Sequence, residues 1–323
     1  MKRLLFLLPI LLLAACGGTE QPGGETPTEP TVYDVPTPSF AKGADISWVS
    51  EMESTGKTFK KRDGTPADIF DVLKEVGVNS IRLRVWVDPT GGLITLTVAP
   101  HAVYTVGPEL LVSCAEVTRE LGMKLHIHLS ETRREVDDCI REHSMTPVRY
   151  LDKLGVLGDN VIAAHVVHVD EEEAAILAAR GVTISHCPCS NMKLASGVFP
   201  YKMLHKAGCR ITLGTDGDSS NNNLDMREEM KFAALQAKSS SGDPETMPAD
   251  EALAMATRAG AEAFGIDAGV IAEGKLADAL LIDLQDVQMQ PLHNLVSNWV
   301  YAASSRCIDT VICNGKVLMT QSR

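Results

Sequence analysis

The sequence predicts an α/β fold of the (β/α)8 TIM-barrel type that is one strand short of a complete barrel. Strand-like apolar runs alternate with helical stretches along the chain, which is typical of a parallel sheet covered by helices. Seven such runs can be counted, whereas a complete barrel of this type has eight strands. The chain has 323 residues, of which 45% are apolar and 22% charged, and this composition favours a folded core over disorder.

The first two predicted strands lie before residue 92. One falls in the run GADISWVSEM (43–52) and the other in SIRLRVWV (80–87), and apolar residues at helical spacing occupy 69–76 between them. A cluster of Asp, Pro, Thr and Gly at 88–92 then ends the pattern. This region is therefore predicted to form a strand, a helix and a second strand.

The other five predicted strands follow the breaker cluster at regular intervals. They are the apolar runs at 93–100, 124–131, 161–169, 182–188 and 210–216. Helical patterns separate these runs and are expected at 108–121, 145–154, 171–179 and 201–207.

The N-terminus is predicted to direct export. Two basic residues precede an apolar run at 4–13, and small residues follow it up to Cys16, which is the order found in export signals. The end of this run, Leu-Ala-Ala-Cys, resembles a bacterial lipobox, which implies lipidation of Cys16 and a chain anchored by lipid to the cell envelope. A plain signal peptide with an incidental cysteine is the alternative. Residues 17–39 are rich in Gly, Pro, Thr and Glu and are expected to form a flexible tether.

The net charge argues against nucleic acid as a partner. Thirty basic and 42 acidic residues give a formal charge of −12 at pH 7. Such a charge repels phosphate backbones.

Polar side chains occur at or just beyond the ends of the last five predicted strands. In a barrel the loops after these ends build the active site, so we expect the side chains to converge, although a single histidine on a strand is more often a core residue. We expect His126 to point away from His128. Imidazoles together with a carboxylate are ligands suited to zinc, which generates a nucleophile from bound water. The pattern predicts a metal-assisted hydrolase built on His101, His128, Glu131, His165, His186 and Asp216.

Long motifs in this half of the chain resemble those of the amidohydrolase superfamily, and most of all its 5-methylthioadenosine/S-adenosylhomocysteine deaminases. The resemblance covers about residues 93–320. The motifs are VAPHAVYT (98–105), HIHLSET (126–132), AAHVVH (163–168), SHCPCSN (185–191) and TLGTDGDSSNNNLDM (212–226).

The resemblance implies a role for each of these side chains. His128 and Asp216 correspond to ligands of one zinc ion, or of another divalent metal, and Asp216 also takes a proton from the attacking water. His165 lies beside that water and is a candidate third ligand. Glu131 corresponds to the proton shuttle, and His101 to a contact near the ribose. The implied reaction is hydrolytic loss of ammonia from the adenine of a small nucleoside.

One family feature is missing from this sequence. The deaminases carry a His-x-His pair on the first barrel strand, whereas the first histidine here is His101. In its place, FAKGADISWVSEME (40–53) and SIRLRVWVDPTGG (80–92) resemble the start of a glycoside hydrolase family 53 arabinogalactan endo-β-1,4-galactanase. A galactan hydrolase is therefore an alternative function, and a non-catalytic chimeric chain is another. The missing pair predicts a weakened metal site.

The C-terminal stretch resembles the small β-domain that flanks amidohydrolase barrels. The similarity rests on GVIAEGKLADALLIDL (269–284) and CIDTVICNGKVLM (307–319), and it implies a partial domain. The predicted organisation is an export signal, a tether, a galactanase-like segment, an amidohydrolase-like segment and this partial domain, at 1–16, 17–39, 40–92, 93–265 and 266–323.

Overall fold

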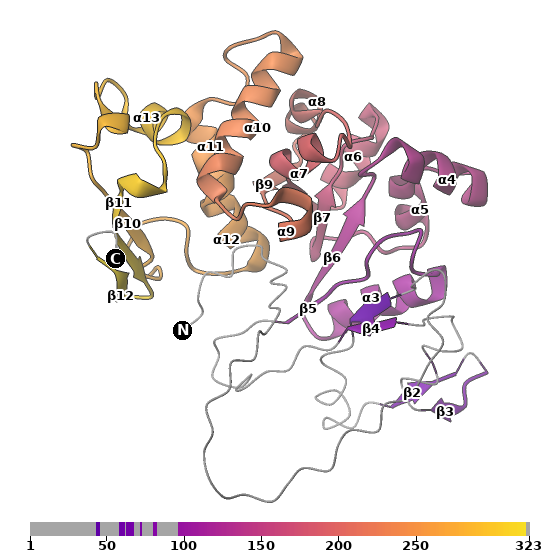
Figure 1. Cartoon of the computed structure of the whole chain (residues 1–323). Helices are drawn as coiled ribbons and strands as arrows, with labels where there is room; N and C mark the ends of the chain where they lie inside the picture. The colour runs from indigo at the N-terminus through magenta and orange to yellow at the C-terminus, as the bar shows by residue number, and fades with distance from the viewer. Residues whose placement is uncertain are drawn as a thin grey trace, which may run out of the picture.

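The computed structural model describes residues 43–45, 58–61, 63–67, 72, 80–82 and 96–320 (Figure 1). The predicted export signal with Cys16 and the predicted tether lie outside the described residues. Within the described residues, no helix has the length and apolar character needed to cross a membrane. Among the described residues, Cys114, Cys139, Cys187, Cys189, Cys209 and Cys307 are free thiols.

A five-stranded parallel sheet forms the centre of the described structure. Its strand order is β5-β6-β7-β8-β9, so each strand pairs with the next one in sequence. This sequential parallel order is that of a barrel wall, and it confirms the predicted α/β, TIM-barrel-like class together with the last five strands. The strands are β5 (Thr97–Val98), β6 (Lys124–Leu129), β7 (Val161–His165), β8 (Thr183–His186) and β9 (Arg210–Leu213).

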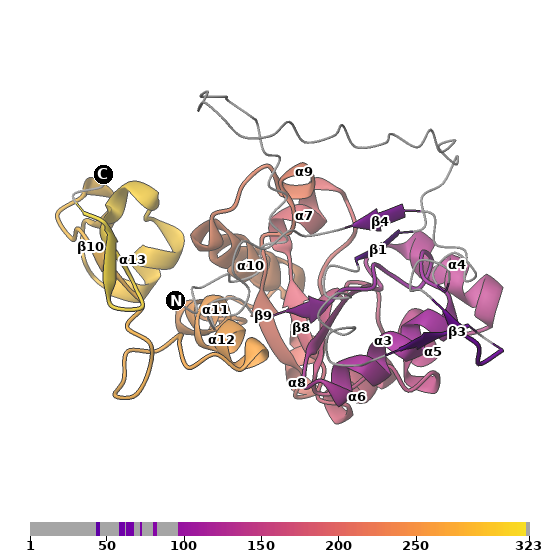
Figure 2. The same cartoon turned by 90° about the horizontal axis from the view of Figure 1, so that it is seen from below.

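Helices between the strands cover the sheet with their apolar sides. The four predicted helices are confirmed, and a further helix, α4, follows β6. Leu111, Leu151, Leu177 and Leu204 come from the predicted helices and are fully buried in one core with the sheet residues Leu125, Ile127 and Leu129. These helices are α3 (Pro108–Glu120), α4 (Arg133–His143), α5 (Pro147–Lys153), α6 (Glu171–Ala179) and α8 (Tyr201–Lys206), and Figure 2 shows α3, α6 and α8 along one side of the sheet.

Shorter helices and a helical layer follow the last two strands. Helix α7 (Pro188–Lys193) begins directly after β8, and α9 (Asp218–Asn221) begins after β9. The longer α10 (Met226–Ser241) packs against α11 (Ala249–Ala256), which is followed by α12 (Arg258–Phe264). Because α7 and α9 lie just beyond strand ends, they bring their side chains to the edge where the polar residues gather.

The segment before residue 96 contains two small sheets. Strands β1 (Gly43–Asp45) and β4 (Ser80–Arg82) pair in parallel, as predicted for the first two strands, and among the described residues they form a sheet of their own. Of the predicted helix at 69–76, only Val72 is described, and it is helical.

A hairpin of β2 (Phe59–Lys60) and β3 (Pro66–Ala67) was not predicted. Its strands have two residues each, which is too short for an alternation of apolar and polar residues to be recognised in the sequence. Asp63 shapes the turn by accepting a hydrogen bond from the Thr65 amide at 2.8 Å, and Gly64 adopts a φ of +84° that suits glycine.

A three-stranded antiparallel sheet at the C-terminus agrees with the expected β-unit. It consists of β10 (Ala279–Ile282), β11 (Ile308–Cys313) and β12 (Lys316–Met319). Asn314 and Gly315 connect the last two strands with positive φ values of 49° and 72°, as a tight hairpin turn requires. Helix α13 (Leu295–Tyr301), flanked by short 3-10 turns at Val287–Met289 and Ser305–Cys307, packs against α10 and α11 (Figure 1).

Candidate active site

The polar side chains predicted to converge are carried by the carboxyl ends of the parallel strands. On β6, Leu125, Ile127 and Leu129 are buried, whereas His126 and His128 share the less buried face. The expectation that His126 points away from His128 was wrong, because residues two apart on a strand point to the same side. The centroids of their rings lie 6.4 Å apart.

His128 is oriented by the loop after β5. Its backbone N–H and its Nδ1 both lie within hydrogen-bond distance of the carbonyl oxygen of His101, at 2.9 and 2.8 Å. A carbonyl can only accept, so Nδ1 carries the hydrogen and Nε2 keeps a lone pair. His128 therefore has the tautomer of a metal ligand or of a hydrogen-bond acceptor for substrate.

His101 lies at the exposed side of this group. The centroid of its ring is 4.6 Å from that of His128 and 5.5 Å from that of Tyr104. Its Nδ1 lies 3.1 Å from the hydroxyl of Thr105, and burial of part of the ring together with the nearby His128 lowers the pKa of His101. The exposed position agrees with a contact to the outer part of a substrate.

His165 ends β7 and is almost completely buried, with 1% of its surface exposed. Its Nδ1 hydrogen bonds to the side-chain oxygen of Asn191 at 2.8 Å, so Nε2 presents a lone pair. That nitrogen lies 3.7 Å from Oε2 of Glu131. Burial lowers the pKa of His165, which favours the neutral ring.

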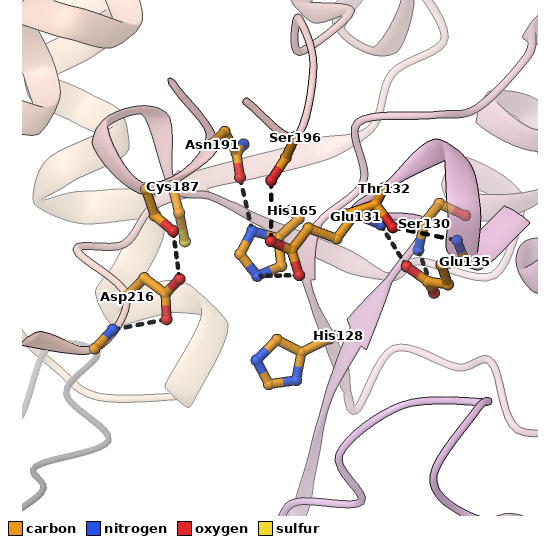
Figure 3. A network of polar contacts seen from close by, with 12 residues as sticks. His128, Ser130, Glu131, Thr132, Glu135, His165, Cys187, Asn191, Ser196 and Asp216 are labelled. Carbon is orange, nitrogen blue, oxygen red and sulfur yellow. Dashed lines mark hydrogen bonds and ion pairs between the residues drawn. The ribbon is translucent and has the colours of Figure 1, made fainter. Parts of the chain in front are cut away.

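Hydrogen bonds hold both the side chain and the backbone of Glu131. The hydroxyl of Ser196 donates to its Oε1 at 3.1 Å, and its own backbone N–H donates to Glu135 at 2.7 Å. The other carboxylate oxygen, Oε2, faces His165 (Figure 3). Glu131 therefore has one oxygen fixed by a donor and one directed into the site.

Asp216 completes the group from the loop after β9. Its Oδ2 accepts a hydrogen bond from the hydroxyl of Ser190 and its Oδ1 accepts one from the backbone N–H of Gly217, both at 2.6 Å. Figure 3 shows Asp216, His128, His165 and Glu131 around one region of space. The structure thus brings together these four predicted residues, with His101 beside them.

Strained backbone also occurs at these strand ends. Ser130, His165 and Asp216 have φ values of +50°, +73° and +60°, a region that costs residues other than glycine free energy. Each of them lies at or within three residues of the end of its strand. Strained backbone of this kind accumulates at functional sites, where the fold maintains it to aim a side chain.

His186, the remaining strand-end histidine, packs in the core. Its ring stacks on Phe199 with a centroid distance of 3.9 Å and an angle of 10°. Complete burial lowers the pKa of His186 to about 3, and its Nδ1 has no hydrogen-bond partner among the described residues. His186 thus remains a neutral ring that packs in the core.

Four partner residues were not identified from the sequence alone. Ser190 and Asn191 belong to the motif SHCPCSN, where their position on α7 directly after β8 was the available signal. Glu135 follows Thr132 by three residues, a spacing typical of helix starts. Ser196 had no signal, because its contact with Glu131 spans 65 residues of sequence.

The described residues supply zinc-type donors but do not complete a metal centre. The free Nε2 of His128 and the carboxylate of Asp216 are donors that zinc accepts. No group of three or more His, Cys, Asp or Glu residues in the described part of the chain is placed to hold a metal ion.

The model of the amidohydrolase family matches residues 67–318. The chain belongs to the amidohydrolase family. The match starts within the segment 40–92 that resembles a galactanase, and the predicted boundaries between segments remain predictions.

Curated relatives of this amidohydrolase carry the names of adenine-nucleoside deaminases. A 5-methylthioadenosine/S-adenosylhomocysteine deaminase of Moorella thermoacetica is 47% identical over 249 residues, covering 76% of this chain and 58% of that protein. A 5'-deoxyadenosine deaminase of Methanospirillum hungatei is 50% identical over 228 residues, covering 70% and 51%. The chain therefore spans little more than half the length of these relatives.

A solved structure with bound zinc has a similar fold. The adenosine deaminase from Xanthomonas campestris aligns with a TM-score of 0.71 and 34% identity, covering 87% of this chain and 60% of that one. None of these three proteins is a glycosidase or is named a lipoprotein, so the galactanase and lipobox resemblances gain no support from them.

Proposed function

We propose that this amidohydrolase removes the amino group of adenine hydrolytically from a small nucleoside such as 5-methylthioadenosine, S-adenosylhomocysteine or 5'-deoxyadenosine. The names of the relatives support the class of substrate. The observation that carries the proposal is the pairing of Glu131 Oε2 with His165 Nε2 at 3.7 Å, beside Asp216 and His128 (Figure 3). This arrangement offers acid and base groups on one side of a shared space.

The reaction requires several proton movements. The oxygen of water bonds to the ring carbon, and the bond from that carbon to the amino nitrogen breaks. In our proposal Glu131 carries one proton of the attacking water to the ring nitrogen, and Asp216 accepts the other and passes it to the departing amino group, so both carboxylates end in their starting state. The second water proton leaves with the amino group as ammonia. Positioned carboxylates suit these transfers because general acids and bases act from fixed hydrogen-bond distances.

His165 and His101 serve the same reaction in different ways. The buried His165 has its Nε2 next to Glu131, from which it orients the water and the carboxylate. The exposed His101 stands at the outer side of the group, where a ribose would lie if the base entered first.

We extend the proposal to a divalent metal, with zinc as the first candidate. The zinc-bound neighbour structure and the donor chemistry of His128 and Asp216 support it, and His165 is a third candidate ligand. When bound, the ion would activate water as a nucleophile. Because the described residues lack a three-donor group, we expect the ion to bind more weakly than at a complete four-ligand site.

The test is an assay of the purified chain with the three nucleosides, before and after dialysis against a chelator and after addition of zinc. Release of ammonia that depends on Glu131 supports the proposal, with Glu131→Gln as the inactive control. Absence of ammonia release at every metal concentration overturns it. Galactan is the comparison substrate, and release of galacto-oligosaccharides would favour the galactanase alternative.

The cellular location is a separate proposal that rests on residues 1–16 alone. We infer that the chain is exported and anchored by lipid on Cys16. Labelling with a radioactive fatty acid tests this inference, because the label should be incorporated by the natural chain and lost in Cys16→Ala. Equal labelling of both chains would contradict it.

A further inference from the structure

The first turn of α4 holds a buried carboxylate next to the proposed active site. Thr132 caps the helix and accepts a hydrogen bond from the backbone N–H of Glu135 at 3.2 Å. The side chain of Glu135 is 5% exposed. An acid at this position is favoured by the helix dipole, but burial to this extent requires further partners.

Both oxygens of Glu135 bind backbone N–H groups of the turn that carries Glu131. Oε1 accepts from Ser130 at 2.9 Å and Oε2 accepts from Glu131 at 2.7 Å (Figure 3). Ser130 is fully buried and has the positive φ of +50°. The carboxylate therefore holds two successive N–H groups in a conformation that the backbone would not adopt unaided.

The arrangement costs the protein electrostatic free energy. Burial raises the pKa of Glu135, the two N–H donors oppose that shift, and the negative charge of Glu131 adds to it. A carboxylate that serves only to cap a helix gains nothing from lying near a second carboxylate. The cost is explained if the position of Glu131 matters for more than stability.

Helix α6 shows the same residue type used for capping, together with an ion pair between Glu173 and Arg149 at 3.9 Å. Asp170 and Glu173 form a reciprocal capping box, in which Glu173 Oε2 accepts from the Asp170 N–H at 2.9 Å and Asp170 Oδ1 accepts from the Glu173 N–H at 2.8 Å. Glu173 is also buried, with 2% exposed. It has the same position in its helix as Glu135 but binds no residue of the site.

We propose that Glu135 is a positioning residue for the reaction, which holds the turn at Ser130 and Glu131 so that the Glu131 carboxylate reaches both Ser196 and the space beside His165. The inference rests on the proposed deaminase function, because it assigns Glu135 to the shuttle of that reaction. Glu135 touches no reacting atom. It acts only through the backbone of Glu131.

The test compares Glu135→Gln with Glu173→Gln as the matched control. An amide keeps the shape of the side chain but can accept only one of the two N–H bonds well, so the turn loosens. Displacement of a catalytic group by about 1 Å lowers a rate by about 100-fold, and we expect kcat of Glu135→Gln to fall by about 10- to 100-fold with KM nearly unchanged. Glu173→Gln should keep kcat within about twofold and lose as much thermal stability.

Equal kcat in Glu135→Gln and the natural chain overturns the proposal, as does an equal loss of kcat in both variants. The pH dependence of kcat gives a further readout. Displacement of Glu131 should shift the part of this profile that reports the proton shuttle, whereas a loss of stability alone should leave the profile unchanged.

Amide hydrogen exchange separates this proposal from the proposed function. The amides of Ser130 and Glu131 should be protected in the natural chain and in Glu173→Gln, and should exchange at least about tenfold faster in Glu135→Gln. If the natural chain deaminates no nucleoside, the proposed function fails, and the exchange of these two amides still decides whether Glu135 holds the turn. Unchanged protection in Glu135→Gln overturns the inference whatever the activity.

Discussion

Helices α4 and α6 begin alike and yet serve different purposes. Each has a capping residue, Thr132 or Asp170, and a buried glutamate three positions later. The difference arises in the preceding loops. After β7, the N–H groups of Val166, Val167 and His168 bond to carbonyls of Leu129 and Ser130, so Glu173 is free to complete its capping box.

The loop before α4 is shorter and lacks these backbone partners. Only Ser130 and Glu131 lie between the end of β6 at Leu129 and the capping residue Thr132, and the N–H groups of both bond to Glu135. One sequence pattern therefore only stabilises a helix in one place and also binds the backbone of the preceding turn in the other. Which of the two occurs depends on the neighbouring strand.

The largest expected effect concerns Glu131, which directly precedes the capping residue of α4. Glu131→Gln should lower kcat by about 100- to 10,000-fold, because loss of a general acid or base costs that much. The measurement is ammonia release at saturating nucleoside. Glu171→Gln, an exposed change at the α6 start, should keep the natural rate, and a similar loss in both variants would remove the contrast between the two helices.

The next effect concerns β8, whose terminal histidine does not join the site. His186 is neutral when folded, with a pKa of about 3 against an ordinary 6.5. Between these values the unfolded chain binds a proton that the folded chain does not, so stability is complete above about pH 6.5 and falls with decreasing pH by about 1.4 kcal/mol per unit. Between about pH 6.5 and pH 5, His186 alone therefore lowers the free energy of unfolding by about 2 kcal/mol.

Denaturant unfolding of His186→Leu at several pH values measures this contribution. The loss of unfolding free energy on acidification should be smaller than in the natural chain by about 2 kcal/mol over that interval. His293→Gln, at an exposed position, should change nothing. Identical pH dependence in His186→Leu and the natural chain would mean that His186 is not buried as a neutral ring.

Ser196→Ala tests the second contact of Glu131. Loss of one hydrogen bond to a carboxylate costs about 1.5 kcal/mol, so kcat should fall by about tenfold. Ser113→Ala, which removes a hydroxyl bonded to the Glu109 carbonyl on the exposed side of α3, is the control. A rate equal to that of the natural chain would show that Glu135 alone positions Glu131.

The smallest effects concern the two caps. Thr132→Ala and Asp170→Ala should each lower the unfolding free energy by about 1 kcal/mol, because each leaves a helix N–H without its partner. Thermal unfolding measures this loss. Only Thr132→Ala should also lower kcat, since α4 carries Glu135. A lower kcat in Asp170→Ala would contradict the assignment of α6 to stability alone.

The sequence by itself determined the central strands of this amidohydrolase and the candidate residues of its site. Apolar runs of sufficient length predicted all five strands of the parallel sheet, because a buried strand needs a continuous run of apolar residues. The motifs at their ends identified His128, Glu131, His165 and Asp216. Helix α4 escaped prediction because its sequence, RREVDDCIREH, is mostly polar and has few apolar residues to reveal a period.

Only the tertiary structure decided which of these side chains lie together. His186 and His165 both end strands, but stacking on Phe199 removes the first while Asn191 orients the second. Ser196 and Glu131 meet across 65 residues. Glu135 and Glu173 have different partners because the loops before their helices leave different N–H groups without a backbone partner. Local sequence fixes the backbone of an element, whereas the partners of a buried polar group depend on distant segments that pack against it.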